Sequence, residues 1–88
     1  MDTLQKDKIR INHIIDAINE ALSFIEGVQI ERFNTDRKLI LSVIKEIEII
    51  GEAAARLSDE TMNKYPGIPW KDIVGMRNRL IILKWMLN

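Results

Sequence analysis

The chain contains 88 residues, in which 13 lysines and arginines balance 13 aspartates and glutamates. This length favours a single domain, residues 1–88, with a core too small for a large enclosed active site. The absence of cysteine excludes a disulfide framework, a zinc ribbon and a thiol nucleophile, and favours a reducing cytoplasm. Zero net charge argues against a general nucleic-acid coat protein, and no apolar run approaches the roughly 18 residues of a membrane span. We therefore expect a cytoplasmic protein without membrane contact.

The first predicted helix begins after Asp2 or Thr3, either of which can serve as an N-cap. It ends near Gly27, because glycine readily adopts the left-handed conformation that terminates many helices. A short connector, residues 28–33, follows it. Apolar residues recur along this helix at three- and four-residue spacing and indicate one buried face: Ile11, Ile14, Ile15, Ile18, Ala21, Leu22 and Ile25.

The second predicted helix is capped by Asn34, Thr35 or Asp36 and is the most apolar segment of the chain. Its apolar residues cover more than one stripe of the helix, so we expect a central helix with neighbours on several sides. More than about 20 residues without a turn signal is too long for a strand. The apolar positions are Leu39, Ile40, Leu41, Val43, Ile44, Ile47, Ile49, Ile50, Ala53, Ala54 and Leu57.

A short third helix is predicted to begin at Ser58 and to end at residues 65–67. The last helix begins at Pro69, because proline is tolerated in a first helical turn, and it continues through Leu87. The predicted fold is an all-α antiparallel helical bundle. We expect Tyr65 and Trp70, which flank the proline-containing turn, to close the end of the bundle rather than to stack on a nucleic-acid base.

Gly51 lies inside the most apolar helix, where glycine costs about 1 kcal/mol relative to alanine. We therefore predict a close approach of another segment at this position. The simpler interpretation of the neighbouring Glu52 is an ion pair with Arg56, four residues later. In the alternative, Glu48 and Glu52 share a face and hold a basic residue of another helix.

The segment from residue 69 to residue 88 contains four basic residues and one acid, so it could form a small phosphate-contacting patch around Arg77, Asn78 and Arg79. Charges on an exposed helix face are more often simply solvated. His13 is the only histidine, and we expect it to pair with a carboxylate at the surface. We expect neither a metal nor a cofactor, because His13 has no further ligands with a clear place.

Three segments together resemble the HepT-like branch of the HEPN superfamily: residues 49–54, residues 65–73 and residues 75–81. The resemblance covers roughly residues 3 to 81. Members of this branch are small helical-bundle proteins of bacteria and archaea, regarded as ribonuclease toxins and commonly paired with an MNT-type minimal nucleotidyltransferase antitoxin. The resemblance therefore implies a HEPN-like bundle, an RNA substrate and such a partner.

The family's catalytic signature is Arg, four residues, His, one residue, Tyr. Arg77 occupies the arginine position, but Ile82 occupies the histidine position and Lys84 the tyrosine position. An isoleucine cannot transfer a proton, and a lysine, with an ordinary pKa near 10.4, is a poor base at neutral pH. The family's tyrosine is also regarded as the acceptor of AMP from the partner, and Lys84 has no hydroxyl group. We therefore expect a ribonuclease toxin by descent that is catalytically inactive.

Family members continue beyond the motif with a further segment that completes the bundle. Similarity here fails abruptly after Ile81, so we expect a chain truncated after the motif helix, with its tail as the scar of a frameshift or a truncation. The alternative is a diverged, non-catalytic dimerisation module that binds a nucleotidyltransferase, and a third reading is a bundle with no surviving function. The abundance of apolar surface favours a homodimer, in which Arg77 and its symmetry mate would form a basic site with weak affinity for RNA.

Overall fold

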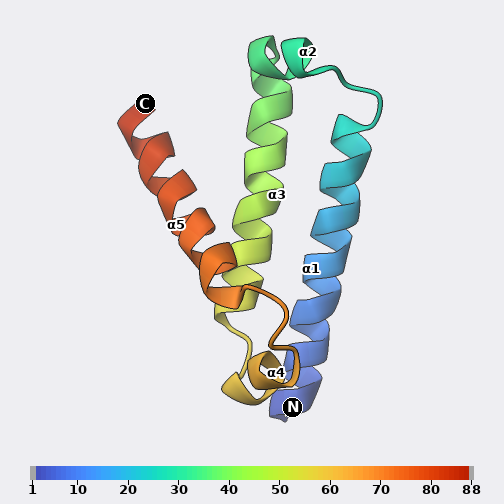
Figure 1. The fold of residues 1–88 in the computed structure, drawn as a ribbon, viewed down its shortest axis with the longest axis vertical. Helices are drawn as coiled ribbons and strands as arrows, with labels where there is room; N and C mark the ends of the chain where they lie inside the picture. Colours follow the sequence, from blue (N-terminus) through green and yellow to red (C-terminus); the bar gives the residue numbers. More distant parts are fainter. Residues whose placement is uncertain (1, 88) are drawn as a thin grey trace.

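The computed structural model describes residues 2–87, apart from the side chains of Lys84 and Leu87, and within that range it contains helices and no strand. Three helices are long: α1 (Thr3–Ile25), α3 (Arg37–Ala55) and α5 (Trp70–Leu87). Two are short: α2 (Ile30–Thr35) and α4 (Asp59–Lys64). Figure 1 shows α3 between α1 and α5, with α2 at one end of the molecule and α4 at the other. The predicted all-α class is confirmed.

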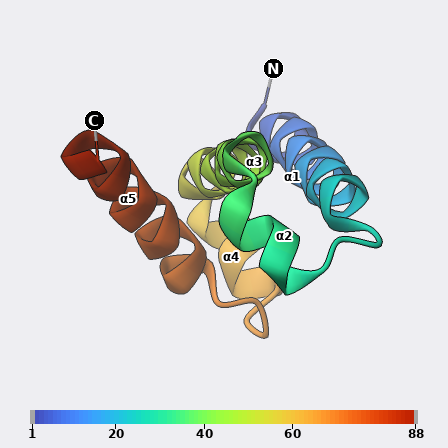
Figure 2. The same ribbon diagram turned by 90° about the horizontal axis from the view of Figure 1, so that it is seen from above.

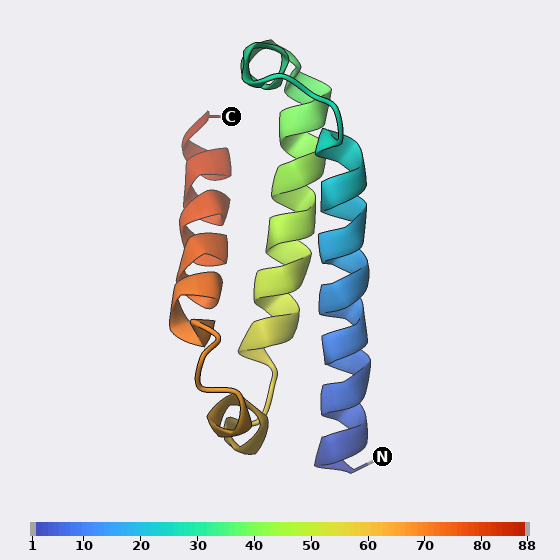
Figure 3. The same ribbon diagram turned by 45° about the vertical axis from the view of Figure 1, so that its right-hand side comes forward.

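The long helices alternate in direction. Figure 3 shows α1 and α3 side by side and antiparallel, with α5 running antiparallel to α3 on its other side. The view from above in Figure 2 places α3 in the middle, as its broad apolar surface predicted. None of the helices in the described range of residues 2–87 has the combination of length and hydropathy needed to span a membrane.

Both ends of α1 lie where the sequence predicts them. Asp2 is the N-cap: its side chain accepts a hydrogen bond from the backbone N–H of Gln5 at 2.8 Å, and its own N–H donates to the Gln5 side chain at 3.2 Å. This reciprocal arrangement satisfies two backbone donors that a helix start otherwise leaves unpaired. The helix stops at Ile25, and Gly27 follows with a positive φ of 71°.

The predicted connector over residues 28–33 is wrong in part, because α2 begins at Ile30 within it. A six-residue helix is too short to produce a clear hydrophobic period, so the pattern that reveals α1 and α3 could not reveal α2. Asp36 then ends α2 and caps α3, since its side chain accepts a hydrogen bond from the N–H of Leu39 at 3.1 Å. One of the three predicted caps is thereby confirmed.

The most deeply buried apolar residues within residues 2–87 are small ones from the middle of the bundle, together with one leucine: Ala17, Ala53, Ala54 and Leu57. Small side chains allow the helices to approach closely, but they remove little apolar surface from water. Many large apolar side chains stay partly exposed. The predicted buried face of α1 is therefore wrong for the four of its residues that are 40–56% exposed: Ile15, Ile18, Leu22 and Ile25. The exposed ones at the C-terminal end of α5, where the helix diverges from α3, are Ile82, Leu83, Trp85 and Met86 (Figure 1).

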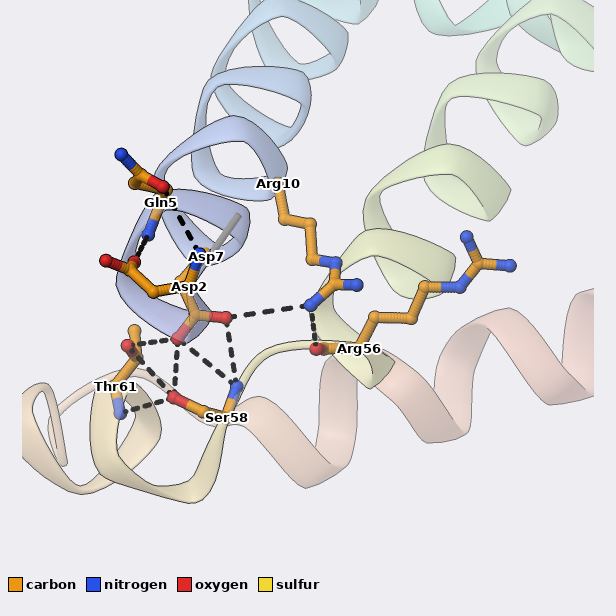
Figure 4. A network of polar contacts seen from close by, with 7 residues as sticks. All are labelled: Asp2, Gln5, Asp7, Arg10, Arg56, Ser58 and Thr61. Carbon is orange, nitrogen blue, oxygen red and sulfur yellow. Dashed lines mark hydrogen bonds and ion pairs between the residues drawn. The ribbon is translucent and has the colours of Figure 1, made fainter.

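A polar network fastens the start of α1 to the turn between α3 and α4 (Figure 4). Asp7, only 1% exposed, accepts hydrogen bonds from the Ser58 hydroxyl, from the Ser58 N–H at 3.2 Å and from the Thr61 hydroxyl at 2.6 Å. Arg10 Nη1 lies 3.7 Å from the Asp7 carboxylate and donates to the backbone carbonyl of Arg56 at 2.7 Å. The hydroxyl groups of Ser58 and then Thr61 hold the pKa of Asp7 below its ordinary value.

Candidate functional site

Arg77 of α5 packs directly over Gly51 of α3. A Cβ atom placed on Gly51 would lie 2.2 Å from Arg77 Cβ and 2.7 Å from Arg77 Cγ, far inside van der Waals contact. The close approach predicted at Gly51 is therefore present, and the residue that approaches is Arg77. Cβ and Cγ of Arg77 pack against α3, so the first part of the side chain has little freedom to move.

The Nε atom of Arg77 is shielded from solvent and has no hydrogen-bond partner within residues 2–87. A buried donor that lacks a partner costs about 1–3 kcal/mol, so stability alone does not explain an arginine here. The side chain as a whole is half-buried, which leaves part of it accessible. Arg77 thus combines a closely packed stem with a buried Nε–H that has no partner within the described residues.

The three residues of the predicted basic patch do not share one face. Consecutive residues of an α-helix point about 100° apart, so Asn78 and Arg79 turn progressively away from the Arg77 contact and are exposed. Asn78 and Ile82, four residues apart, lie on the same side of α5. Ile82 is 59% exposed, and the prediction that concerns the Lys84 side chain falls outside the described residues.

The acidic residues near Gly51 have separate environments. Glu52 Oε1 lies 3.4 Å from Arg56 Nη2, four residues later on α3, which confirms the simpler interpretation. Both side chains are well exposed, so this pair contributes little to stability. Glu48, which the alternative interpretation pairs with Glu52 to hold a basic residue of another helix, is half-buried on α3.

His13 lines an open groove of about 350 Å³ between α1 and α3, together with Lys6, Arg10, Glu52 and Arg56. His13 is exposed, as expected, but the expected pairing with a carboxylate is not found: the ion pairs described within residues 2–87 are Arg10–Asp7, Arg32–Asp36 and Arg56–Glu52. No group of three or more His, Asp or Glu side chains in the described part of the chain is arranged to hold a metal ion. Of the two aromatic residues expected at the end of the bundle, Tyr65 is 48% exposed and Trp70 is half-buried.

Sequence reasoning missed two buried carboxylates, Asp7 and Glu46. Glu46 is 6% exposed on α3, where burial and then the nearby Glu20 raise its pKa. The sequence does contain a signal for both residues, because each lies three or four residues from an apolar residue of the same helix. Asp7 is four residues before Ile11 on the apolar face of α1, and Glu46 is three residues after Val43 and four before Ile50 on α3.

Comparison with known proteins gives a consistent result. The profile of the family described as "Ribonuclease HepT-like" matches residues 14–82. A "Putative RNase" of Methanocaldococcus jannaschii is 34% identical over 68 residues, which cover 77% of this chain and 62% of the relative. The "Probable ribonuclease HepT" of Thermococcus cleftensis is 34% identical over 71 residues, which cover 81% of this chain and 64% of the relative. No solved structure matches.

A further relative from M. jannaschii, named "Gamma-glutamylcyclotransferase and putative RNase", is 40% identical over 79 residues, or 89% of this chain and 36% of the relative. The fold and the match define an all-α ribonuclease-type helical domain. The chain belongs to the HepT-like ribonuclease family. It spans less than two thirds of the length of the relatives described above.

Proposed function

We propose that this chain is a cytoplasmic HepT-like protein that binds RNA through α5 without cleaving it, derived from the toxin of a toxin–antitoxin pair. The observation that carries the proposal is the pairing of a fixed, half-buried Arg77 with an exposed Ile82 at the position where the family has its histidine. Arg77 supplies a cation for phosphate, and Ile82 supplies no group that can move a proton.

The chemistry of RNA cleavage explains why this combination binds without turnover. Metal-independent cleavage requires removal of the 2′-hydroxyl proton and stabilisation of the negative charge that develops at phosphorus. Arg77 serves the second requirement alone. Asn78 and Arg79 are exposed on other faces of α5, so they offer separate polar contacts and do not belong to the Arg77 site itself.

The test uses a labelled single-stranded RNA and measures both its binding and its integrity. We expect salt-dependent binding and no cleavage product. Arg77→Met keeps the packed stem but removes the charge, so binding should weaken and the slope of log affinity against log salt should fall by about 0.7 for one lost phosphate contact. Arg37→Met, at the opposite end of α3, removes an exposed arginine as a matched control and should leave the slope unchanged.

Restoring the two motif residues tests the second half of the proposal. The double variant Ile82→His, Lys84→Tyr should gain cleavage activity above the parent chain, because it regains the proton-transfer group of the family's motif. The same variant should also become an acceptor for AMP from a nucleotidyltransferase of the family's partner type, whereas the parent chain should not. Equal labelling of both chains by radioactive ATP would contradict the assignment of position 84.

A second candidate function is a non-catalytic interaction module that forms a homodimer and binds a nucleotidyltransferase. It is favoured by the exposed apolar side chains at the end of α5, of which Trp85 is 80% exposed. Light scattering across micromolar concentrations should give the mass of a dimer. A monomer mass throughout, together with no complex on mixing with the nucleotidyltransferase, would exclude this candidate.

A further inference from the structure

The corner between α4 and the start of α5, which lie near each other in Figure 2, contains two hollows whose lining residues both include Trp70. The first has a volume of about 350 Å³ and is lined largely by apolar groups, from Ala55, Met62, Trp70, Val74 and Gly75, with Asn78 as a polar neighbour. The second, of about 440 Å³, lies on the side of the proline-containing turn. We call the first the Trp70 hollow; its volume lies within the roughly 300–1,000 Å³ of small-ligand sites.

The orientation of the Trp70 ring is fixed. Its Nε1–H donates a hydrogen bond to the backbone carbonyl of Tyr65 at 3.2 Å, across the turn that contains Pro66 and Pro69. The ring is half-buried, so part of the indole is accessible from the hollow. A fixed aromatic ring in an open, apolar hollow is the arrangement on which single-stranded nucleic acids stack their bases.

The polar residues at the hollow suit a nucleotide. Lys71 borders both hollows, and it is the charged residue that lines the Trp70 hollow. The second hollow is also lined by the carboxylates Asp59 and Asp72, so an anionic phosphate is favoured on the side of the Trp70 hollow. Asn78 provides both a donor and an acceptor, as recognition of a base edge requires. Asn78 also lies on the face of α5 that carries Ile82, so the hollow adjoins the proposed RNA-binding surface.

We propose that the Trp70 hollow receives one unpaired RNA base, stacked on Trp70, with Asn78 at the base edge and Lys71 at the adjoining phosphate. This rests on the proposed RNA binding and adds to it a subsite for the base. Gly75 keeps the hollow open: a Cβ atom on this residue would meet no other atom within 4 Å. A larger side chain at position 75 would therefore fill the hollow without a clash within the protein.

The test makes Trp70 the only tryptophan through Trp85→Phe, a change at a residue that is 80% exposed. A short oligouridylate is titrated in while its binding is followed by anisotropy and the Trp70 emission is recorded. We expect quenching with the same midpoint as binding. An abasic strand of the same length should bind about 5- to 150-fold more weakly, which is the equivalent of losing one stacked base.

Gly75→Leu in the same background should abolish the quenching and weaken binding of the oligouridylate by a similar factor. Met76→Leu, a change at the next, exposed residue outside the hollow, is the matched control and should alter neither signal. Both variants should retain the helical circular dichroism of the parent chain.

Different results would overturn the base subsite alone or the RNA-binding proposal as well. Binding without quenching, with equal affinity for the abasic strand, would overturn the base subsite and leave the RNA-binding proposal intact. Trp70 emission that changes with protein concentration before RNA is added, in step with the measured mass, would show that a second copy occupies the hollow and would also overturn the subsite. Failure to bind either strand would overturn both proposals.

Discussion

The contact between Gly51 and Arg77 predicts that Gly51→Ala destabilises the protein. The new methyl carbon would lie 2.2 Å from Arg77 Cβ, whereas non-bonded carbons prefer about 3.5–4.0 Å, so α3 and α5 must separate locally by roughly 1.3–1.8 Å. The atoms that clash are the first carbons of Arg77, next to its backbone, and not the flexible end of the side chain. Rotation of the arginine therefore cannot relieve the contact.

The expected magnitude follows from two opposing effects. Overpacking of a close contact costs about 1–3 kcal/mol, and replacing glycine by alanine inside a helix recovers about 1 kcal/mol. Because the clash involves near-backbone atoms, we expect the upper part of the first range and a net loss of about 1–2 kcal/mol in the free energy of unfolding. For a domain of this size each kcal/mol corresponds to about 4–8 °C in Tm.

Gly75→Ala is the matched control, since Gly75 also lies inside a long helix but its added Cβ would meet nothing within 4 Å. It should stabilise the protein by about 1 kcal/mol, so the two alanine variants should differ by about 2–3 kcal/mol. Urea unfolding followed by circular dichroism measures both values. If the Gly51 variant proved as stable as the Gly75 variant, the account of the close approach of Arg77 would be wrong.

Three further predictions concern stability. Glu46→Gln should raise stability at pH 7, because burial raises the pKa of Glu46 and the charged carboxylate therefore destabilises the folded state. The parent chain loses stability as the pH rises from the ordinary pKa through the raised one. The advantage of the variant should therefore vanish in acid, below the ordinary pKa. Asp7→Asn should lower stability at neutral pH. Because the pKa of Asp7 is lowered, this difference should shrink as pH falls below the ordinary value and through the lowered one, which unfolding curves at several pH values would reveal. Leu57→Ala should cost about 2–5 kcal/mol by urea unfolding, since Leu57 is among the most buried residues of the described chain, and a loss below 1 kcal/mol would place it outside the core.

The sequence predicts most of the helical framework because capping and periodicity are local. Asp2, Asp36 and Ser58 each accept a hydrogen bond from a backbone N–H three residues later. Because Asp and Ser are preferred N-cap residues, these three helix starts can be predicted from the sequence. Gly27 likewise marks the end of α1 through its positive φ. The short α2 has neither a side-chain cap nor enough length for a period, so local reasoning could not find it.

The sequence predicts the candidate site only in part, because the contacts that form it join residues far apart in the chain. The cost of glycine at position 51 predicted a close approach, but which residue approaches depends on the packing of α5 against α3. Asp7 and Ser58 are 51 residues apart in sequence, and only the fold brings them together. Trp70 was assigned to the end of the bundle, where it does lie, but its open hollow depends on Gly75 and Met62, which belong to different helices.

We propose that Arg77 binds RNA and that the chain lacks the group that transfers a proton. The most direct measurement incubates the purified chain with end-labelled single-stranded RNA and follows binding by anisotropy and integrity by gel electrophoresis in the same samples. We expect saturable, salt-dependent binding that weakens in Arg77→Met, with the RNA intact throughout. Cleavage products from the parent chain, or binding that is unaffected by Arg77→Met, would contradict it.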